Sequence, residues 1–214
     1  PPYIIVGNRI RTVGSDIIFA GGNVTIDREN LKGAADSLWL DAGNRQAGQL
    51  IGHASLKTRP EGAATDDDGF TISGRVIDIG LKNRELTSLR ARDSADLLNK
   101  DVTLVADSIG LSLVNRQVET TRAWGKAVRP KVVSADYQIL GDSLLIETPG
   151  QKLSRVKAWG NGWAGFVVDT TKASARRDFV SGQTVTASFV ERDSAGVKKT
   201  AIKDLEAIEE ARAY

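Results

Sequence analysis

The sequence contains no cysteine and only one histidine, and these absences narrow the chemistry that the chain can perform. Without cysteine there is no disulfide framework and no thiolate that could bind a metal or attack a substrate. The single histidine, His53, has no second histidine or cysteine with which to form a zinc site. We therefore expect no metal, no cofactor and no catalytic residues, and we interpret the chain as a protein that is not an enzyme.

The chain also lacks an excess of positive or negative charge, because 29 lysine and arginine residues nearly balance 27 acidic residues, for a formal net charge of +2. Nucleic-acid-binding domains usually concentrate basic residues on one face, and here they are scattered, so we expect no nucleic-acid partner. No apolar run approaches the ~20 residues that a membrane-spanning helix needs. With 41% hydrophobic and 26% charged residues, the composition is that of a folded, water-soluble protein.

Methionine is absent even from position 1, since the chain begins Pro1-Pro2-Tyr3. We interpret the sequence as a processed form or a fragment in which no signal peptide remains to be read. The absence of cysteine fits an exported protein, so we expect a periplasmic, cell-envelope or extracellular location.

The sequence does contain a repeat. Four stretches align without a gap and begin at Asp36, Arg75, Asp107 and Asp142, roughly 35 residues apart, a period typical of stacked supersecondary units. Their turn residues fall in register: Asn44-Arg45-Gln46, Asn83-Arg84-Glu85, Asn115-Arg116-Gln117 and Gly150-Gln151-Lys152. We expect one repeat domain over residues 1–214, whose long shared surface argues against a single catalytic centre.

Apolar and polar residues alternate along the first strand of each unit, as they do in a half-buried β-strand. The second strand follows the turn and leads into a stretch of small residues, such as Gly52-His53-Ala54. Alternating strands joined by short turns, with almost no helical pattern, predict an all-β fold. The side chains predicted to face inward are Leu38, Leu40, Ile77, Ile79, Leu81, Ile109, Leu111, Leu113, Leu144, Ile146 and Val156.

The hairpins are expected to fold over into two facing sheets, with these aliphatic rows between them. Large aliphatic residues on one strand would face glycine and alanine on the next. The small residues either bring the sheets close together or leave room for an alkyl chain, which gains ~0.8 kcal/mol for each buried CH₂ group.

Two partial units flank the four complete ones. Residues 17–26 look like the end of an earlier copy, and residues 183–214 look like a last copy with a longer turn at Asp193-Ser194-Ala195-Gly196. The segment from Lys203 to Arg212 is rich in alanine, glutamate and leucine, which suits a helix, but its register with the preceding unit favours a strand.

Short motifs recur in these units: Ala35-Asp36-Ser37-Leu38 with Leu50-Ile51-Gly52-His53-Ala54, Gly141-Asp142-Ser143-Leu144 with Ala158-Trp159-Gly160-Asn161, and Gly22-Asn23-Val24-Thr25-Ile26. Together they resemble the OstA-like (LptA/LptC-like) lipopolysaccharide-transport family. The resemblance covers roughly residues 16–214.

The resemblance implies an elongated antiparallel β-jellyroll, or β-taco, whose hydrophobic groove carries lipid A acyl chains across the periplasm. It identifies the inward rows as lipid-binding and implies an oligomer in which domains join end to end through open edge strands, with a role in outer-membrane biogenesis. The residues expected at such edges are Tyr3, Ile4, Ile5, Val6, Leu205 and Ile208.

Other motifs suggest chemistry that their context does not support. Gly141-Asp142-Ser143-Leu144 spells a hydrolase signature, but a serine nucleophile needs a nearby base and the only histidine is far upstream. Residues 160–165 fit G-x-G-x-x-G, yet a strand-like sequence follows where a dinucleotide site needs a helix. Asp66-Asp67-Asp68-Gly69 lacks the spacing of a calcium loop and is better interpreted as a turn.

Three further side chains, His53, Trp124 and Trp159, could either serve a ligand or have a purely structural place. His53 is interpreted as a solvated side chain on the outward face of its strand. Trp124 and Trp159 occupy the same strand position in adjacent units, where they either stack on a sugar or a partner or pair with each other across strands. The second reading is favoured, and such a pair contributes ~0.2–1 kcal/mol.

Two functions fit these observations. The first is a non-catalytic lipid conduit or lipid-binding domain of the envelope, with a lipopolysaccharide-like lipid and homologous domains as partners. The alternative is a structural subunit of an extracellular filament or adhesin, assembled by β-strand addition without lipid cargo.

Overall fold

The structure is a computed structural model that describes residues 3–28, 30–58, 69–115, 117–167, 177–194 and 197–213. Every regular element in these residues is a strand, apart from one turn of 3-10 helix at Pro149–Gln151, and the strands pair in antiparallel fashion. The predicted all-β antiparallel fold is therefore confirmed. Within this part of the chain, no helix has the length and apolar character needed to cross a membrane.

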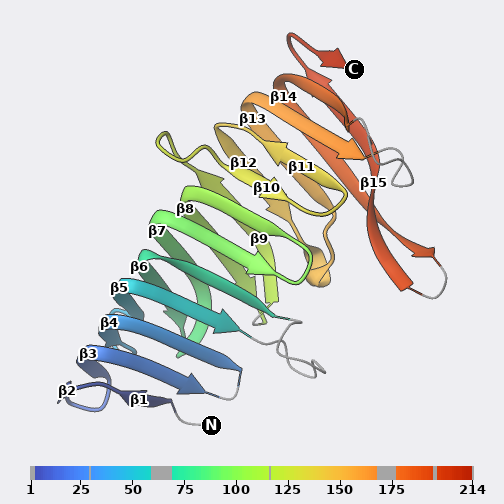
Figure 1. Ribbon diagram of the computed structural model, residues 1–214. Coiled ribbons are helices and arrows are strands. Elements are labelled where there is room, and N and C mark those ends of the chain that lie inside the picture. Colours follow the sequence, from blue (N-terminus) through green and yellow to red (C-terminus); the bar gives the residue numbers. More distant parts are fainter. Residues whose placement is uncertain are drawn as a thin grey trace. The chain divides into compact units, whose positions relative to one another are not determined.

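The chain divides into two compact units (Figure 1). Unit 1 comprises Pro1–Lys100 and Ser108–Gln117, and unit 2 comprises Asp101–Asp107 and Val118–Tyr214. The strand β8 (Thr103–Val114) contributes its first half to unit 2 and its second half to unit 1. A single repeat domain over residues 1–214 stays a prediction.

Unit 1 is an antiparallel meander in which each long strand pairs with the next, from β3 to β7. The two short strands β1 and β2 both pair with β3, one with each half of it. The bounds are β1 (Ile4–Val6), β2 (Arg9–Val13), β3 (Ile17–Arg28), β4 (Leu31–Asp41), β5 (Ala47–Thr58), β6 (Phe70–Lys82) and β7 (Glu85–Asn99). The predicted turns after residues 41 and 82 join β4 to β5 and β6 to β7.

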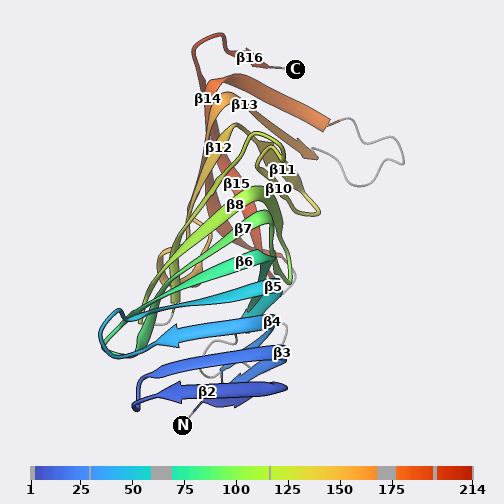
Figure 2. The same ribbon diagram turned by 90° about the vertical axis from the view of Figure 1, so that its left-hand side faces the viewer.

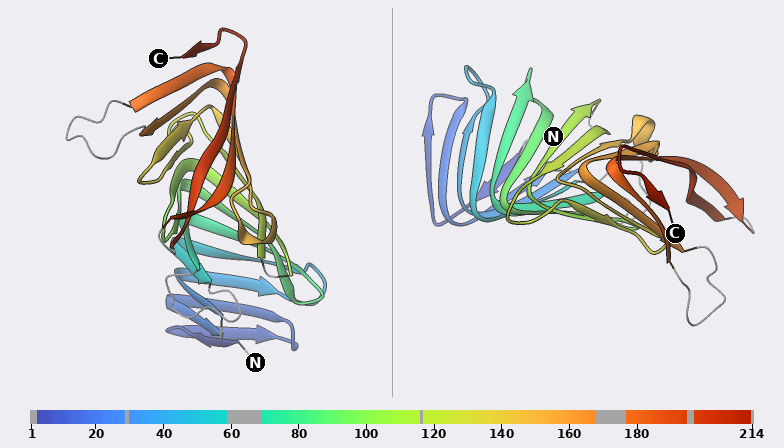
Figure 3. Two further views of the ribbon diagram at one scale, coloured as in Figure 1. Left: turned by 90° about the vertical axis from the view of Figure 1, so that its right-hand side faces the viewer. Right: turned by 90° about the horizontal axis from the view of Figure 1, so that it is seen from above.

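The long strands of unit 1 bend at a corner, and the small residues noted in the sequence lie there. The backbone of Gly22-Asn23 in β3, Gly52-His53 in β5 and Asp93-Ser94 in β7 has positive φ, and the β3–β4, β4–β5 and β5–β6 ladders shift register at their corners. A β-bulge of this kind bends a strand sharply. Each strand therefore continues past the corner into a second layer (Figure 3).

The ladders of unit 1 align the inward side chains into rows, in which large aliphatic residues lie beside one another as well as beside the predicted glycine and alanine. One row before the corner joins Ala20, Leu38, Leu50, Ile77 and Ala91, and the next joins Ile18, Leu40, Gly48, Ile79 and Leu89. Past the corner, a third row joins Ile26, Gly33, Leu56, Ile72 and Leu97. Most of these side chains are buried, so both layers contribute to the core.

Unit 2 uses the same pairing but interrupts two strands at the corner. The long strand β13 pairs with β12 along its first half and with β11 along its second half, so β11 and β12 together correspond to one bent strand. Similarly, β9 ends before a turn and β10 resumes beside β8 (Figure 2). The bounds are β9 (Gln117–Trp124), β10 (Lys131–Val133), β11 (Tyr137–Leu140), β12 (Ser143–Glu147) and β13 (Arg155–Val167).

The last strands complete unit 2. β14 (Arg177–Ser194) pairs with β13, with β15 (Val197–Ile208) and with β16 (Arg212–Ala213). The strand reading of the C-terminal segment is therefore confirmed as far as Ile208, and no helix forms there. The longer turn predicted at residues 193–196 is wrong in its first half, because Asp193 and Ser194 belong to β14 and pair with Lys198 and Val197 of β15. Ala195 and Gly196 lie outside the described residues.

The core of unit 2 includes one buried aromatic pair. The rings of Tyr137 on β11 and Phe189 on β14 lie 5.0 Å apart between centroids, in a tilted arrangement. Burial raises the pKa of Tyr137 to about 12, because the phenolate form loses its hydration there.

Candidate functional site

The predicted lipid-binding residues lie in the interiors of the two units. Leu38, Ile77, Ile79, Ile109, Leu111, Leu113, Leu144, Ile146 and Val156 are buried, and Leu40 and Leu81 are half-buried. In unit 1 the ladders bring Leu38 and Ile77 to either side of Leu50, and Leu40 and Ile79 to either side of Gly48. In unit 2, Ile146 lies opposite Val156. That these rows bind lipid stays a prediction.

Exposure within unit 1 rises along each strand from the corner toward the hairpin turn. Ile77 near the corner is 0% exposed, Ile79 is 9% exposed, and Leu81 next to the turn is half-buried. On β4, Leu38 is buried and Leu40 is half-buried in the same order. The interior is therefore packed beside the corner and more accessible toward the turns.

The sequence analysis missed the row beyond the corner. Ile26, Leu56 and Ile72 are buried there, on the continuation of strands whose first halves were recognised. The signal was present, because Ala54 and Leu56 alternate with Ser55 and Lys57 after the small residues. The bulge shifts the alternation by its extra residues, and for this reason the continuation was not recognised as part of the same strand.

An aspartate followed by a serine recurs at Asp36, Asp107 and Asp142, and each of these aspartates packs against a glycine of another segment. A side chain on Gly52 would collide with the Asp36 carboxylate, and one on Gly160 would collide with Asp142. The carboxylate of Asp107 accepts hydrogen bonds from the backbone N–H groups of Lys126, Ala127 and Val128, at 2.6, 2.8 and 2.7 Å. These bonds, led by the one from Ala127, lower the pKa of Asp107.

This arrangement gives the G-D-S-L sequence a structural role. Asp142 packs against the corner glycine of β13, and its Oδ1 atom lies 3.3 Å from Nε of Arg129. Ser143 begins β12, with Trp124 opposite it on one neighbouring strand and Trp159 opposite it on the other. The single histidine of the chain lies in unit 1.

The favoured reading of Trp124 and Trp159 as a cross-strand pair is wrong. Both face Ser143 from opposite sides, so β12 lies between them and the two tryptophans belong to strands that are not neighbours. Equivalent positions in successive units are two strands apart in a meander, roughly 9–10 Å at the usual strand spacing. The ring of Trp159 instead lies under Nζ of Lys157, at 5.0 Å.

Half-buried polar residues also join three strands of unit 1. Arg92 on β7 donates to both carboxylate oxygens of Asp78 on β6, at 2.8 and 3.1 Å, and Gln49 on β5 donates to the same carboxylate at 2.8 Å. The hydrogen bonds with Asp78 raise the pKa of Arg92. Both oxygens of the carboxylate thus accept hydrogen bonds from neighbouring strands.

The residues predicted at assembly edges lie on outer strands of their units. Tyr3, Ile4 and Val6 on or beside β1 are exposed and Ile5 is half-buried, whereas on β15 Leu205 is half-buried and Ile208 is exposed. β1 already pairs with β3 of the same chain, so only its outer edge is available to another copy. Their role in assembly stays a prediction.

Metal ligands do not cluster in the part of the chain that the structure describes. The side chain of His53 is 94% exposed, as expected of a solvated residue, and its Nδ1 atom lies 3.2 Å from Oδ2 of Asp36. The candidate calcium ligands Asp66, Asp67 and Asp68 lie outside the described residues.

Comparison with known proteins gives a likeness in structure but no match in sequence. No protein-family profile and no curated protein matches the sequence. Among solved structures, the chain is similar to LptH of Pseudomonas aeruginosa, described as the LptA-homologous periplasmic component of the conserved lipopolysaccharide transport device. The TM-score is 0.51 at 13% identity, and the match covers 62% of this chain and 94% of LptH. The fold is therefore that of the LptA-like lipopolysaccharide-transport proteins, as the sequence motifs predicted.

Proposed function

We propose that this chain is a non-catalytic periplasmic component of lipopolysaccharide transport that holds acyl chains between the two layers of its bent strands. The observation that carries the proposal is the aliphatic interior of unit 1, which becomes more accessible toward the hairpin turns in a fold shared with LptH. An acyl chain lying against Leu40, Ile79 and Leu81 would gain ~0.8 kcal/mol for each CH₂ group that it buries.

The polarity of the interior supports this ligand class. Apart from the turn residue Asp41 and Thr121, the residues found buried are hydrophobic or glycine or proline. No buried side-chain nitrogen or oxygen in the described residues lacks a hydrogen-bond partner, so nothing there calls for a polar ligand. A hydrocarbon chain is the ligand that such a surface accepts without leaving a polar group unsatisfied.

Photo-crosslinking tests the lipid proposal. A photoreactive amino acid at Leu40 or Leu113, which face inward, is expected to crosslink to lipopolysaccharide. The same amino acid at Ser112, which is exposed beside Leu113 on β8, is the matched control and is expected not to react. Equal yields at Leu113 and Ser112, or no product at either inward position in the folded protein, would contradict the proposal.

We further propose that copies of this chain or of homologous domains join end to end through the outer edges of β1, β2 and β15. An exposed strand edge offers unpaired N–H and C=O groups to another strand. Val6→Lys on the exposed face of β1 is expected to weaken concentration-dependent assembly in sedimentation velocity, whereas Ser112→Lys is expected to leave it unchanged. Assembly that needs these edges but occurs with no lipid crosslinking would instead favour the filament or adhesin function.

A further inference from the structure

A row of side chains on the outer face of unit 2 is not used by the proposed lipid function. The ladders place Leu140, Trp163, Ser181 and Arg212 side by side on β11, β13, β14 and β16. The adjacent row contains Ile139 and Ala164, both 0% exposed, and therefore faces the interior. Because side chains alternate between the faces of a sheet, Trp163 and its row face away from the interior.

The Trp163 ring is held as a flat platform on this outer face. It lies over Gly165, where any side chain would collide with the ring, and it stacks on Phe179 with centroids 5.9 Å apart and an angle of 28°. The residue remains half-buried, so part of the ring is accessible. A fixed aromatic face is a surface on which a flat apolar group can lie with little loss of side-chain entropy.

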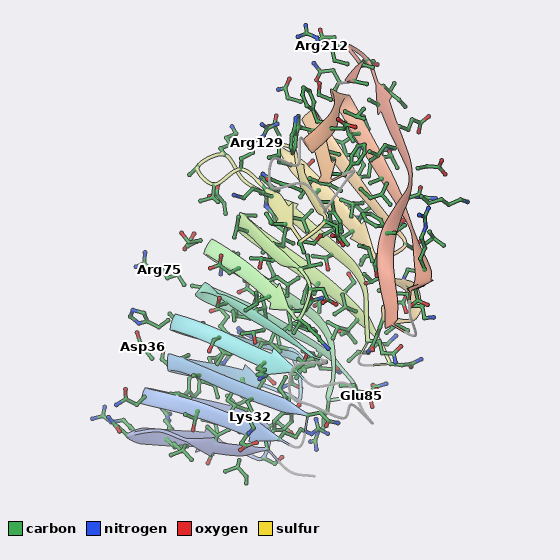
Figure 4. All side chains as sticks on the ribbon, turned by 45° about the vertical axis from the view of Figure 1, so that its right-hand side comes forward. Lys32, Asp36, Arg75, Glu85, Arg129 and Arg212 are labelled. Atoms are coloured by element: carbon green, nitrogen blue, oxygen red, sulfur yellow. The ribbon has the colours of Figure 1, made fainter. Side chains whose placement is uncertain are left out.

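Polar side chains surround this platform in a depression of ≈ 550 Å³, within the range of ~300–1,000 Å³ typical of small-ligand sites. Arg129 is fixed at one side, because its Nη2 atom donates to the carbonyl oxygens of Gly160 and Asn161 at 3.2 and 2.6 Å. Arg212 lies on β16 and has no hydrogen-bonding or ionic partner among the described residues. Both arginines are labelled in Figure 4.

Arg129 is already charge-paired, because its Nε atom lies 3.3 Å from Oδ1 of Asp142, so Arg212 is the cation that the depression offers to a ligand. Among the described residues that line the depression, Glu210 is the acidic one, and its carboxylate accepts a hydrogen bond from Nε2 of Gln183 at 3.3 Å. The remaining polar residues that line it are Gln138, Asn161 and Ser181. The site therefore offers the guanidinium of Arg212, the amide of Asn161, the hydroxyl of Ser181 and one aromatic face.

We propose that this depression binds an anionic saccharide, a sugar that carries a phosphate or a carboxylate. The C–H face of a sugar ring suits the Trp163 platform, its hydroxyl groups suit the asparagine and the serine, and its acidic group suits the guanidinium of Arg212, which pairs with carboxylates and phosphates through two parallel hydrogen bonds. A bare phosphate would make no use of the aromatic platform, and an alkyl chain would make no use of Arg212.

Calorimetric titration of the full chain with glucosamine 6-phosphate tests the site, with glucosamine and inorganic phosphate as comparison ligands. Glucosamine 6-phosphate is expected to bind more tightly than either. Trp163→Leu and Arg212→Ala are each expected to weaken it by about tenfold, because each removes one of the two interaction types. The matched controls are Trp39→Leu, whose ring lies under Arg45 in unit 1, and Arg122→Ala, exposed on β9, and both should bind as the parent does.

The outcomes separate this site from a simple anion site and from the lipid function. Binding of inorganic phosphate as tight as that of the sugar phosphate, or binding unaffected by Trp163→Leu, would overturn the proposal, and so would no binding at all. Arg212→Ala changes an exposed side chain at the chain's end, so it tests the site even if Trp163→Leu unfolds unit 2. Deacylated lipopolysaccharide in place of glucosamine 6-phosphate tests whether the saccharide comes from that lipid. If the photoreactive residue at Leu113 does not crosslink to lipopolysaccharide but the chain still binds the sugar phosphate, the proposed lipid function is refuted and the saccharide site is not.

Discussion

Units 1 and 2 differ in whether their strands continue through the corner. In unit 1, β3, β5 and β7 run through the corner without a break, and their φ angles become positive there. In unit 2, β13 does the same at Gly160-Asn161, but the neighbouring strand is divided into β11 and β12. The strand after that is divided as well, since β9 pairs with β12 and β10 pairs with β11. The repeat therefore keeps the position of the corner and not the continuity of the strand.

The difference shows which part of the corner is needed. In both units a short polar side chain of one strand lies against a corner glycine of the next, as Asp36 does with Gly52 and Asp142 with Gly160. Where β9 ends, the chain leaves the sheet, and the Asp107 carboxylate accepts hydrogen bonds from three backbone N–H groups that would otherwise lack a strand partner. The interruption also positions Arg129, which follows β9, at the depression around Trp163. The departure from the repeat thus produces the surface that we propose as a second binding site.

The substitutions with the largest expected effect on the free energy of unfolding test whether the cores of the two units are equally well packed. Ile77→Ala in unit 1 and Leu144→Ala in unit 2 remove side chains that are 0% and 1% exposed, and each is expected to lower the free energy of unfolding by about 2–5 kcal/mol, since each leaves a cavity. Urea denaturation measures the change, with exposed Val114→Ala as a control of small effect. A loss confined to Ile77→Ala would mean that the core of unit 2 is loosely packed.

The next effect tests whether the corners are equivalent. Gly52→Ala and Gly160→Ala introduce a side chain at positive φ and against an aspartate, so they should destabilise the protein more than Gly14→Ala and Gly150→Ala. The latter two glycines also have positive φ but have nothing within 4 Å of the added carbon, so their cost is that of the backbone alone, about 1–2 kcal/mol. Equal losses at all four positions in thermal denaturation would show that the aspartate contact is unimportant.

A smaller effect concerns the aspartate that bridges the interrupted strand. The lowered pKa of Asp107 means that its contribution to stability is present above its unfolded pKa, near 3.8, and is lost as the pH falls through the lower folded value. Asp107→Asn should therefore lower the urea midpoint at pH 7 and make it less dependent on pH below about 4. Asp36→Asn is the comparison in the uninterrupted unit, and an identical pH response in both variants would count against a special role for Asp107.

The smallest effect concerns the aromatic pair of unit 2 and appears only in alkali. Because the folded pKa of Tyr137 is raised to about 12, its contribution to stability is present below its unfolded pKa, near 10.0, and is lost as the pH rises through the folded value. Tyr137→Phe should weaken the fall of the unfolding midpoint between pH 10 and 12. Parallel curves for the parent and Tyr137→Phe would contradict this assignment.

Several features of the fold were predictable from the sequence because they depend on local pattern. The period-two alternation of Leu38 with Leu40 and of Ile77 with Ile79 identified the inward faces, and the turns after β4 and β6 followed from their turn residues. The pairing of Trp124 with Trp159 was wrong, because equal positions in successive hairpins are not neighbours. The outer-face row from Leu140 to Arg212 was not foreseen, since its members come from four strands that are distant in sequence.

The sequence by itself determined that the chain is built of repeated β-hairpins with one aliphatic face, because alternation and turn chemistry are properties of neighbouring residues. Only the tertiary structure decided how each hairpin is used. Positive φ at the small residues bends the strands into two layers, and strand pairing brings Trp163 beside Arg212 on the outside of unit 2. Such placements depend on hydrogen bonds between distant strands, which no local pattern of residues specifies.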